Sequence, residues 1–267
     1  MNNKPAPTFG HLHQTGFTLV EMAMVLAIVT LLLTGLVPTI SGQLEQRRSA
    51  ETKRQLDEIQ QALIGFVIIK GRLPCPATTS SNGLENPSTG GACTNFYDGF
   101  VPGATLGLNS LNDQGLVLDA WDNPIRYVVT SWDSTSPAKS DVYTTSNYIS
   151  EVGLSSLSPN LLVCATATGL VDTNCSTTQD TNAGCKCATG QALTAGDGVP
   201  AIVFSTGKNG AYGGTGTDEA KNLNNNRIFV SHSSTASSVT NGEFDDLMVW
   251  MSNQVLVNRM VAAGKLP

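Results

Sequence analysis

Six cysteines are the side chains of this sequence with the most evident chemistry, because a thiol can form a disulfide or hold a metal ion. They are Cys75, Cys93, Cys164, Cys175, Cys185 and Cys187. An even number of cysteines is typical of disulfides in an oxidising compartment. Several pairings are open, and loop length favours Cys75 with Cys93, which leaves the other four to staple residues 164–187. Zinc would need CxxC-type pairs and usually histidine, so we predict disulfides.

No set of nucleophile, base and acid is recognisable elsewhere in the sequence. Asp245 and Asp246 could form an acid–base pair, but neighbours on a strand face opposite ways, so we expect them to flank a strand start. The loop of residues 205–210 lacks the spacing of a phosphate-binding GxxxxGK[ST] loop. The formal net charge of −6 disfavours nucleic acid, which needs a basic surface. We therefore predict no catalytic residues and a protein that is not an enzyme.

Glu21 is the carboxylate with the most unusual surroundings, because it lies in the apolar run of residues 17–40. As a helix with a rise of ~1.5 Å per residue, this run would cross the ~30 Å hydrocarbon core of a membrane. A secretory signal peptide would be cleaved after its apolar run, and a plain anchor would not explain a carboxylate. A charge inside a span is costly and suggests a function.

The elements that position these residues begin with one helix over residues 17–70, which crosses the membrane over residues 17–40 and is then amphipathic. Pro38 should kink or locally melt this helix near Gly35. Glycine and proline end it over residues 71–76. Its predicted apolar stripe, at spacings of three and four, consists of Leu56, Ile59, Leu63 and Phe66.

Residues 71–267 should form a globular head of loops and short strands. Apolar and β-branched runs predict strands over residues 125–129, 199–204, 228–230 and 246–250. The expected fold class is α+β, with a long N-terminal helix packed on a small antiparallel sheet whose loops are stapled by disulfides.

The sequence GFTLVE, from Gly16 to Glu21, resembles the type III signal of type IV pilins and type II secretion pseudopilins. The resemblance implies that a prepilin peptidase removes the leader, residues 1–16, by cutting after Gly16, and that it methylates Phe17. Pro38 stands where members of this family often carry proline. The resemblance also implies that Glu21 pairs with the Phe17 amine of a neighbouring subunit as the helices bundle into a filament.

Two stretches of the head also resemble major pseudopilins. Residues 119–127, DAWDNPIRY, are similar to a turn of that family, with Asp122 where the family more often has glycine. Residues 205–219 resemble its glycine-rich calcium loop, which implies calcium near Asp218 and Glu219. These two carboxylates are few oxygen ligands for that ion, and the expected cofactor set is otherwise empty.

The resemblance implies a structural subunit of a type IV pilus or type II secretion pseudopilus, and the large head favours a minor subunit. Its partners would be the prepilin peptidase, other pilin or pseudopilin subunits, an inner-membrane assembly platform and membrane lipid. The head would lie in the periplasm before assembly, and the filament in the periplasm or outside the cell. The basic residues at 47, 48, 53 and 54 favour a cytoplasmic head instead, but the leader and the cysteines outweigh them. The alternative function is an adhesive or ligand-binding tip pilin that uses loops 75–118 and 164–198.

Overall fold

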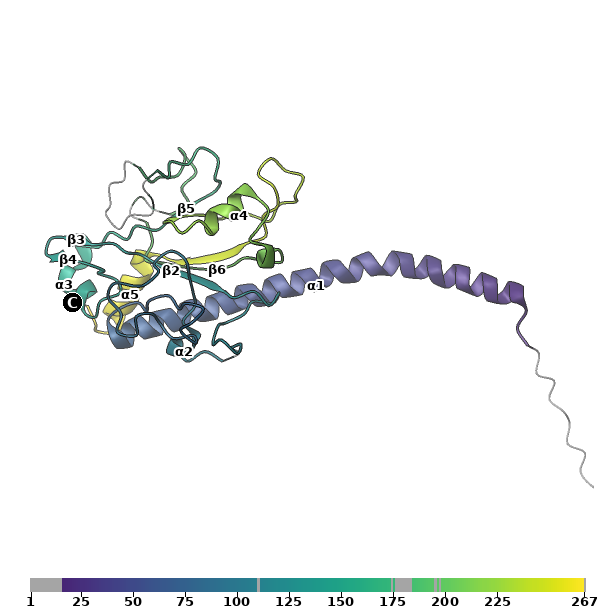
Figure 1. Ribbon diagram of the computed structural model, residues 1–267, viewed down its shortest axis with the longest axis horizontal. Helices are drawn as coiled ribbons and strands as arrows, with labels where there is room; N and C mark the ends of the chain where they lie inside the picture. The colour runs from purple at the N-terminus through teal and green to yellow at the C-terminus, as the bar shows by residue number, and fades with distance from the viewer. Residues whose placement is uncertain are drawn as a thin grey trace, which may run out of the picture. The chain divides into compact units, whose positions relative to one another are not determined.

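The structure is a computed structural model that describes residues 16–109, 111–173, 175, 184–194, 196 and 198–266, without the side chains of residues 33–41 and 212. The chain divides into two compact units, Met1–Arg47 and Arg48–Pro267. Helix α1 (Leu19–Lys70) contributes to both, and the second unit contains every other element shown in Figure 1. We describe each unit by itself.

Within the second unit, α1 buries one apolar stripe against the sheet. The stripe consists of Leu56, Ile59, Leu63 and Val67, each at most 2% exposed. The prediction placed Phe66 at the end of this stripe, which is wrong: Phe66 is half-buried, and the Arg72 guanidinium lies 5.3 Å from its ring centroid. The helix ends at Lys70, and the next residue, Gly71, has a left-handed φ of 69°, as is common after the last turn of a helix.

Four strands form the central antiparallel sheet, in the order β1-β2-β6-β8. They are β1 (Gly99–Phe100), β2 (Arg126–Val129), β6 (Ala201–Ser205) and β8 (Leu247–Met251). Because side chains alternate along a strand, Tyr127 and Val203 pack with the α1 stripe while Val128 and Ile202 face the other way. The predicted mixture of a helix and an antiparallel sheet is therefore present, with α1 along one face of β2 and β6 (Figure 1).

The opposite face of the sheet is covered by two strands that pair in parallel, β5 (Leu162–Cys164) and β7 (Ile228–Val230). Val163 and Phe229 from this pair pack against Val128, Ile202 and Phe204. Residues 228–230 were predicted as a strand, but their pairing with β5 was not. The second unit thus has three layers, with the central sheet between α1 and the β5–β7 pair.

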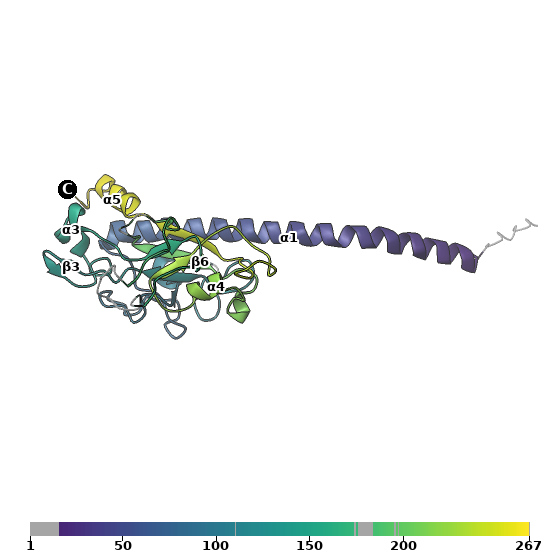
Figure 2. The same ribbon diagram turned by 90° about the horizontal axis from the view of Figure 1, so that it is seen from above.

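The remaining elements are short and complete the layers. They are α2 (Gly103–Leu106), β3 (Ser134–Thr135), β4 (Ala138–Lys139), α3 (Tyr148–Val152), η1 (Leu154–Ser156), η2 (Gly210–Tyr212), α4 (Thr217–Asn222) and α5 (Asn253–Ala262). Helix α5 is capped by the Ser252 hydroxyl, which accepts from the Val255 amide, and it buries Leu256 and Met260 in the cluster that contains Leu63. Figure 2 shows α5 beside the C-terminal end of α1.

All six cysteines form disulfides: Cys75–Cys93, Cys164–Cys187 and Cys175–Cys185. The prediction of a disulfide-stapled protein is confirmed, and the first pair is the one that loop length favoured. Of the other two pairs, Cys164–Cys187 connects β5 to residue 187, and Cys175–Cys185 joins two residues that lie between Cys164 and Cys187 in the sequence. They hold a region in which the described core consists of a few side chains around Ile228.

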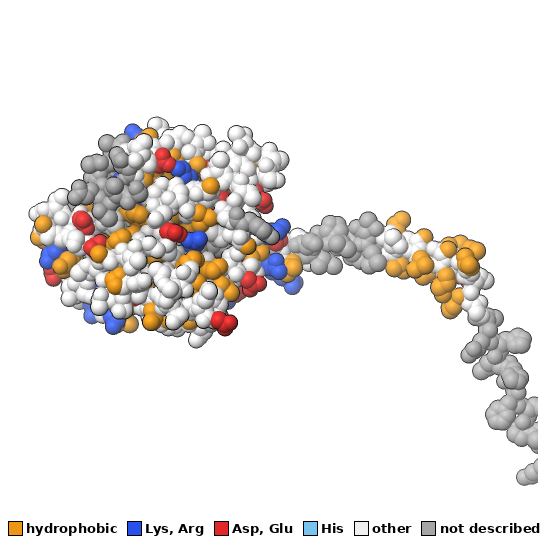
Figure 3. Space-filling model, in the orientation of Figure 1, with side chains coloured by type: hydrophobic (Ala, Val, Ile, Leu, Met, Phe, Trp, Pro, Cys, Tyr) orange, Lys and Arg blue, Asp and Glu red, His pale blue; other side chains and the backbone are white. Residues whose placement is uncertain are grey.

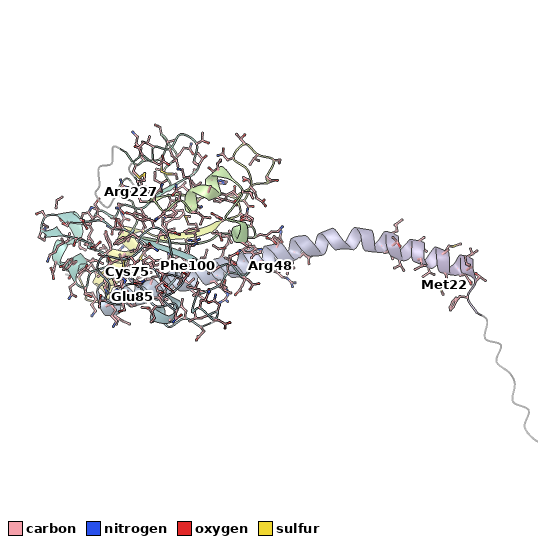
Figure 4. All side chains as sticks on the ribbon, in the orientation of Figure 1. Met22, Arg48, Cys75, Glu85, Phe100 and Arg227 are labelled. Carbon is pink, nitrogen blue, oxygen red and sulfur yellow. A yellow bond between two sulfur atoms is a disulfide. The ribbon has the colours of Figure 1, made fainter. Side chains whose placement is uncertain are left out.

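A buried ion pair supports the loop that contains the first disulfide. The Arg72 guanidinium binds both oxygens of Glu85, at 2.7 and 2.8 Å, and both residues are about 5% exposed. Glu85 also accepts the amide of Cys75 at 3.1 Å, and Figure 4 shows Cys75 and Glu85 close together. One carboxylate therefore joins the end of α1, the disulfide and residues 84–86.

The turn before β2 explains one departure from the resembled family. Asp119 Oδ1 accepts the amides of Trp121 and Asn123, and its Oδ2 accepts the hydroxyl of Ser205. Asp122 lies between these amides with a φ of 66°, a left-handed conformation that glycine adopts most easily and that aspartate tolerates. The turn therefore has a left-handed backbone at residue 122, a conformation that glycine adopts easily and that is compatible with the aspartate here.

Candidate functional site

The first described residues of the chain form a capped helix start. The Thr18 hydroxyl accepts the Glu21 amide at 3.2 Å, and Glu21 Oε2 accepts both the amide and the hydroxyl of Thr18 at 2.9 Å. This reciprocal pattern is a capping box, which satisfies backbone donors that a helix start leaves without partners. The Glu21 carboxylate is therefore held at the N-terminus of α1, where the helix dipole favours a negative charge.

The predicted cleavage point lies just before this capped start. Gly16 and Phe17 are outside the helix and exposed, and the Phe17 side chain is 79% exposed. A Cβ built at Gly16 would meet no atom within 4 Å, and its φ is not left-handed. The chain's own fold therefore does not require glycine at residue 16.

The helix that follows is apolar all round and exposed. The large apolar side chains exposed along it are Leu19, Val20, Met22, Met24, Val25, Leu26, Ile28, Val29, Leu31 and Leu32. Figure 3 shows them as the orange side chains gathered on this stretch of helix. Scattered exposed apolar residues are ordinary in soluble proteins, but a continuous patch marks a surface that binds lipid or protein.

Two predictions for this helix concern residues whose side chains lie outside the description. The prediction was a kink or local melting near Gly35. The backbone of α1 is helical through Pro38, so the melting is wrong, while the kink stays a prediction and nothing is described of the Pro38 side chain. Within the described part of the chain, no helix has an apolar stretch long enough for a membrane crossing. The side chains of residues 33–40 belong to the predicted span, and the structure does not describe them.

Comparison with known protein families matches residues 12–37 to the prokaryotic N-terminal methylation motif. This motif is the signature of type IV pilins and pseudopilins. The match includes Gly16, Phe17 and Glu21, and it ends before the head begins. No curated protein and no solved structure matches the chain.

The methylation motif also contains a residue that our sequence reasoning missed. No role was predicted for Thr18, whereas the structure makes it the partner of Glu21. The signal was available, because Thr18 and Glu21 have the S/T-x-x-E spacing of a capping box.

In the head, the two predicted calcium ligands lie side by side on α4 but serve different neighbours. Asp218 accepts from the Ala167 amide at 2.6 Å and from Asn241 Nδ2 at 3.0 Å, and it lies 3.1 Å from His232 Nε2. Glu219 instead lies with Asp245 and Asp246, and oxygens of these three carboxylates are within 4.8 Å of one another. Calcium therefore stays a prediction, and the structure brings Glu219 together with a pair that the prediction did not include.

This cluster of three carboxylates is electrostatically unfavourable when all are ionised. Burial, followed by the nearby Glu219 carboxylate, raises the pKa of Asp245 to about 6. Burial also raises the pKa of Asp246 to about 8, against the hydrogen bond from Asn222, with Glu219 and Asp245 adding to the shift. The raised pKa values of Asp245 and Asp246 favour their protonated forms, and a bound proton lowers the charge of the cluster.

Proposed function

We propose that this chain is a structural subunit of a type IV pilus or type II secretion pseudopilus. The observation that supports it most directly is the methylation motif, because its cleavage residues coincide with an exposed junction before a capped helix. A peptidase needs an accessible chain, and residues 16–18 are exposed and lie before the helix begins. A glycine that the fold does not require is also consistent with recognition by another protein.

The apolar start of α1 supports two successive environments for this subunit. Ten large exposed apolar side chains between residues 19 and 32 are unfavourable in water, by roughly 25 cal/mol per Å² of apolar area. Lipid would cover them before assembly, over the predicted span of residues 17–40. Helices of neighbouring subunits would cover them in a filament, with the heads outside, so the subunit is placed in the inner membrane first and in a filament afterwards.

We expect the mature protein to begin at Phe17 and to carry one added methyl group there. Mass spectrometry of the N-terminus, on protein from cells with and without prepilin peptidase, checks this. Gly16→Leu should prevent cleavage, because the bulky side chain stands next to the scissile bond. Gly42→Leu is the matched control, since a Cβ at Gly42 also meets no atom within 4 Å, and it should be processed normally. An intact leader in wild-type protein, or a cut after the apolar run, contradicts the proposal.

We further propose a minor subunit, because the head of residues 71–267 is larger than the head of a major pseudopilin of the resembled family would need to be. In sheared filaments its abundance should be well below that of the major subunit, measured by quantitative mass spectrometry. The tip pilin is the alternative, and it predicts about one copy at the end of each filament. An abundance equal to that of the main subunit contradicts both roles.

A further inference from the structure

Glu219 is the most densely hydrogen-bonded carboxylate among the described residues, and it is 1% exposed. Its Oε1 accepts the Asp245 amide at 2.9 Å and Asn209 Nδ2 at 3.1 Å. Its Oε2 accepts the amides of Thr215 and Gly216 at 2.9 and 3.2 Å, and Asn209 Nδ2 at 3.0 Å. One carboxylate therefore connects three places in the chain: Asn209, the amides of residues 215–216 in the glycine-rich loop, and Asp245 before β8.

The glycines of this loop fit a carboxylate at its centre. A Cβ on Gly214 would lie 2.8 Å from Glu219 Cβ and 3.0 Å from its Oε2. A Cβ on Gly216 would lie 2.1 Å from the carbonyl oxygen of Glu243. The glycine-rich sequence that resembles a calcium loop is thus explained by the close approach of the backbone to Glu219 and to the segment before β8.

The hydrogen-bond donors around Glu219 can be compared with the ligands that a calcium ion needs. A carboxylate has about four acceptor positions, and those of Glu219 are filled by N–H groups. Calcium requires about 6–8 oxygen ligands. The Asp245 and Asp246 carboxylates bring oxygens within 4.8 Å of those of Glu219, but the groups that contact the Glu219 oxygens directly are N–H donors. The residues present therefore do not fit calcium at Glu219, although the resembled loop implies it.

Two nearby oxygens are the strongest observation in favour of a cation. Asn209 Oδ1 and Asp245 Oδ1 are buried and lack a hydrogen-bond partner among the described residues. However, the Asn209 amide directs its nitrogen towards Glu219, because the reverse orientation would place oxygen against oxygen. A Cβ on Gly207 would lie 2.0 Å from Asp245 Oδ1, so that oxygen lies against backbone and not in open space.

We infer that Glu219 is a buried internal anion that organises residues 207–216 and 243–246, and that these loops fold without a bound metal ion. In this chain the Glu219 carboxylate accepts hydrogen bonds from N–H donors of both segments. In the resembled loop, a calcium ion bound by oxygens would connect the backbone instead. The charged acceptor makes each of these hydrogen bonds stronger than a neutral one. The inference is independent of filament assembly.

Tryptic cleavage after Lys208 tests this inference, because Lys208 is exposed in the loop and its amide bonds to Asp245 Oδ2 at 3.1 Å. The full-length protein in detergent is digested in EDTA and, separately, in CaCl₂, and the products are followed by mass spectrometry. Wild-type protein should be cut at the same slow rate in both. Glu219→Gln should be cut about tenfold faster in both, since backbone donors lose a charged acceptor.

Glu243→Gln is the matched control, because it removes a carboxylate from the same segment without touching these donors, and it should be cut at the wild-type rate. Slower cleavage of wild-type protein in CaCl₂, with saturable calcium binding by calorimetry, overturns the inference in favour of a metal site. Cleavage of Glu219→Gln at the wild-type rate also overturns it. The comparison of wild-type cleavage in EDTA and in CaCl₂ needs no variant, so it tests for a metal site even if Glu219→Gln fails to fold. It also involves no filament, so its result does not depend on the proposed function.

Discussion

Replacing Glu85 by alanine should lower the free energy of unfolding of the second unit by about 3–5 kcal/mol, the range for breaking a buried ion pair. The Arg72 guanidinium would remain in place, about 5% exposed and without its bidentate partner. An isolated buried charge is far more costly than a lost surface contact. The Cys75 amide would also lose an acceptor.

Urea unfolding of the full-length protein in detergent, followed by tryptophan fluorescence, measures this effect. The three tryptophans, at 121, 132 and 250, all lie in the second unit, so the signal reports on that unit. Asp98→Ala is the control, because it breaks the pair of Asp98 with Arg126, whose side chains are 44% and 24% exposed. That change should cost less than about 1 kcal/mol.

A double variant separates the buried charge from the loss of packing. Arg72→Met with Glu85→Leu removes both charges and keeps similar volume, so it should recover much of the stability that Glu85→Ala loses. A loss of under about 1 kcal/mol for Glu85→Ala would contradict the prediction. It would mean that water reaches Arg72 in solution.

The sequence predicted the features that local patterns determine. The spacing of Leu56, Ile59 and Leu63 located the buried face of α1, and the run before Val129 located β2. It missed that Val67, not Phe66, continues the stripe, because both positions fit helical spacing.

Features made by residues far apart in the chain could not be predicted in this way. The parallel pairing of β5 with β7 joins residues 162–164 to residues 228–230, and no local pattern specifies that register. The same holds for Glu219, whose partners Asn209 and Asp245 lie on separate segments. The methylation motif at the N-terminus was recognisable because its residues are close together in the sequence, whereas the pairing of Thr18 with Glu21 was missed although its three-residue spacing was visible.

Glu21→Ala should lower incorporation into filaments by at least about tenfold while leaving membrane insertion intact. If the Glu21 carboxylate pairs with the Phe17 ammonium of a neighbouring subunit, its removal leaves that ammonium uncompensated in a low-dielectric helix bundle, a loss of about 3–5 kcal/mol. Insertion should be unchanged or better, since removing a charge from an apolar span favours insertion by up to ~3 kcal/mol. Cleavage after Gly16 should persist because the scissile residues are unchanged.

A variant of the capping box is the control that distinguishes a role of Glu21 between subunits from its role in capping its own helix. Glu21 Oε2 holds Thr18, so Glu21→Ala also weakens the helix start, by about 1 kcal/mol. Thr18→Val removes the hydroxyl of that box and keeps the carboxylate. If Glu21 acts between subunits, Thr18→Val should assemble nearly as well as wild type, whereas Glu21→Ala should not.

The comparison is made on three quantities for each variant: the level in the membrane fraction, the level in sheared filaments and the mass of the N-terminus. The mass is needed because reduced methylation of Phe17 would itself alter the ammonium that Glu21 is expected to meet. Equal losses of filament for Thr18→Val and Glu21→Ala would show that the helix cap accounts for the effect. Wild-type filament levels in Glu21→Ala would remove the physical support for an intersubunit pair. A loss of filaments in Glu21→Ala alone, with normal processing, assigns the carboxylate to assembly. Thr18→Val would then show that the hydrogen bonds between Thr18 and Glu21 are not what assembly requires, so the requirement is for the charge of Glu21.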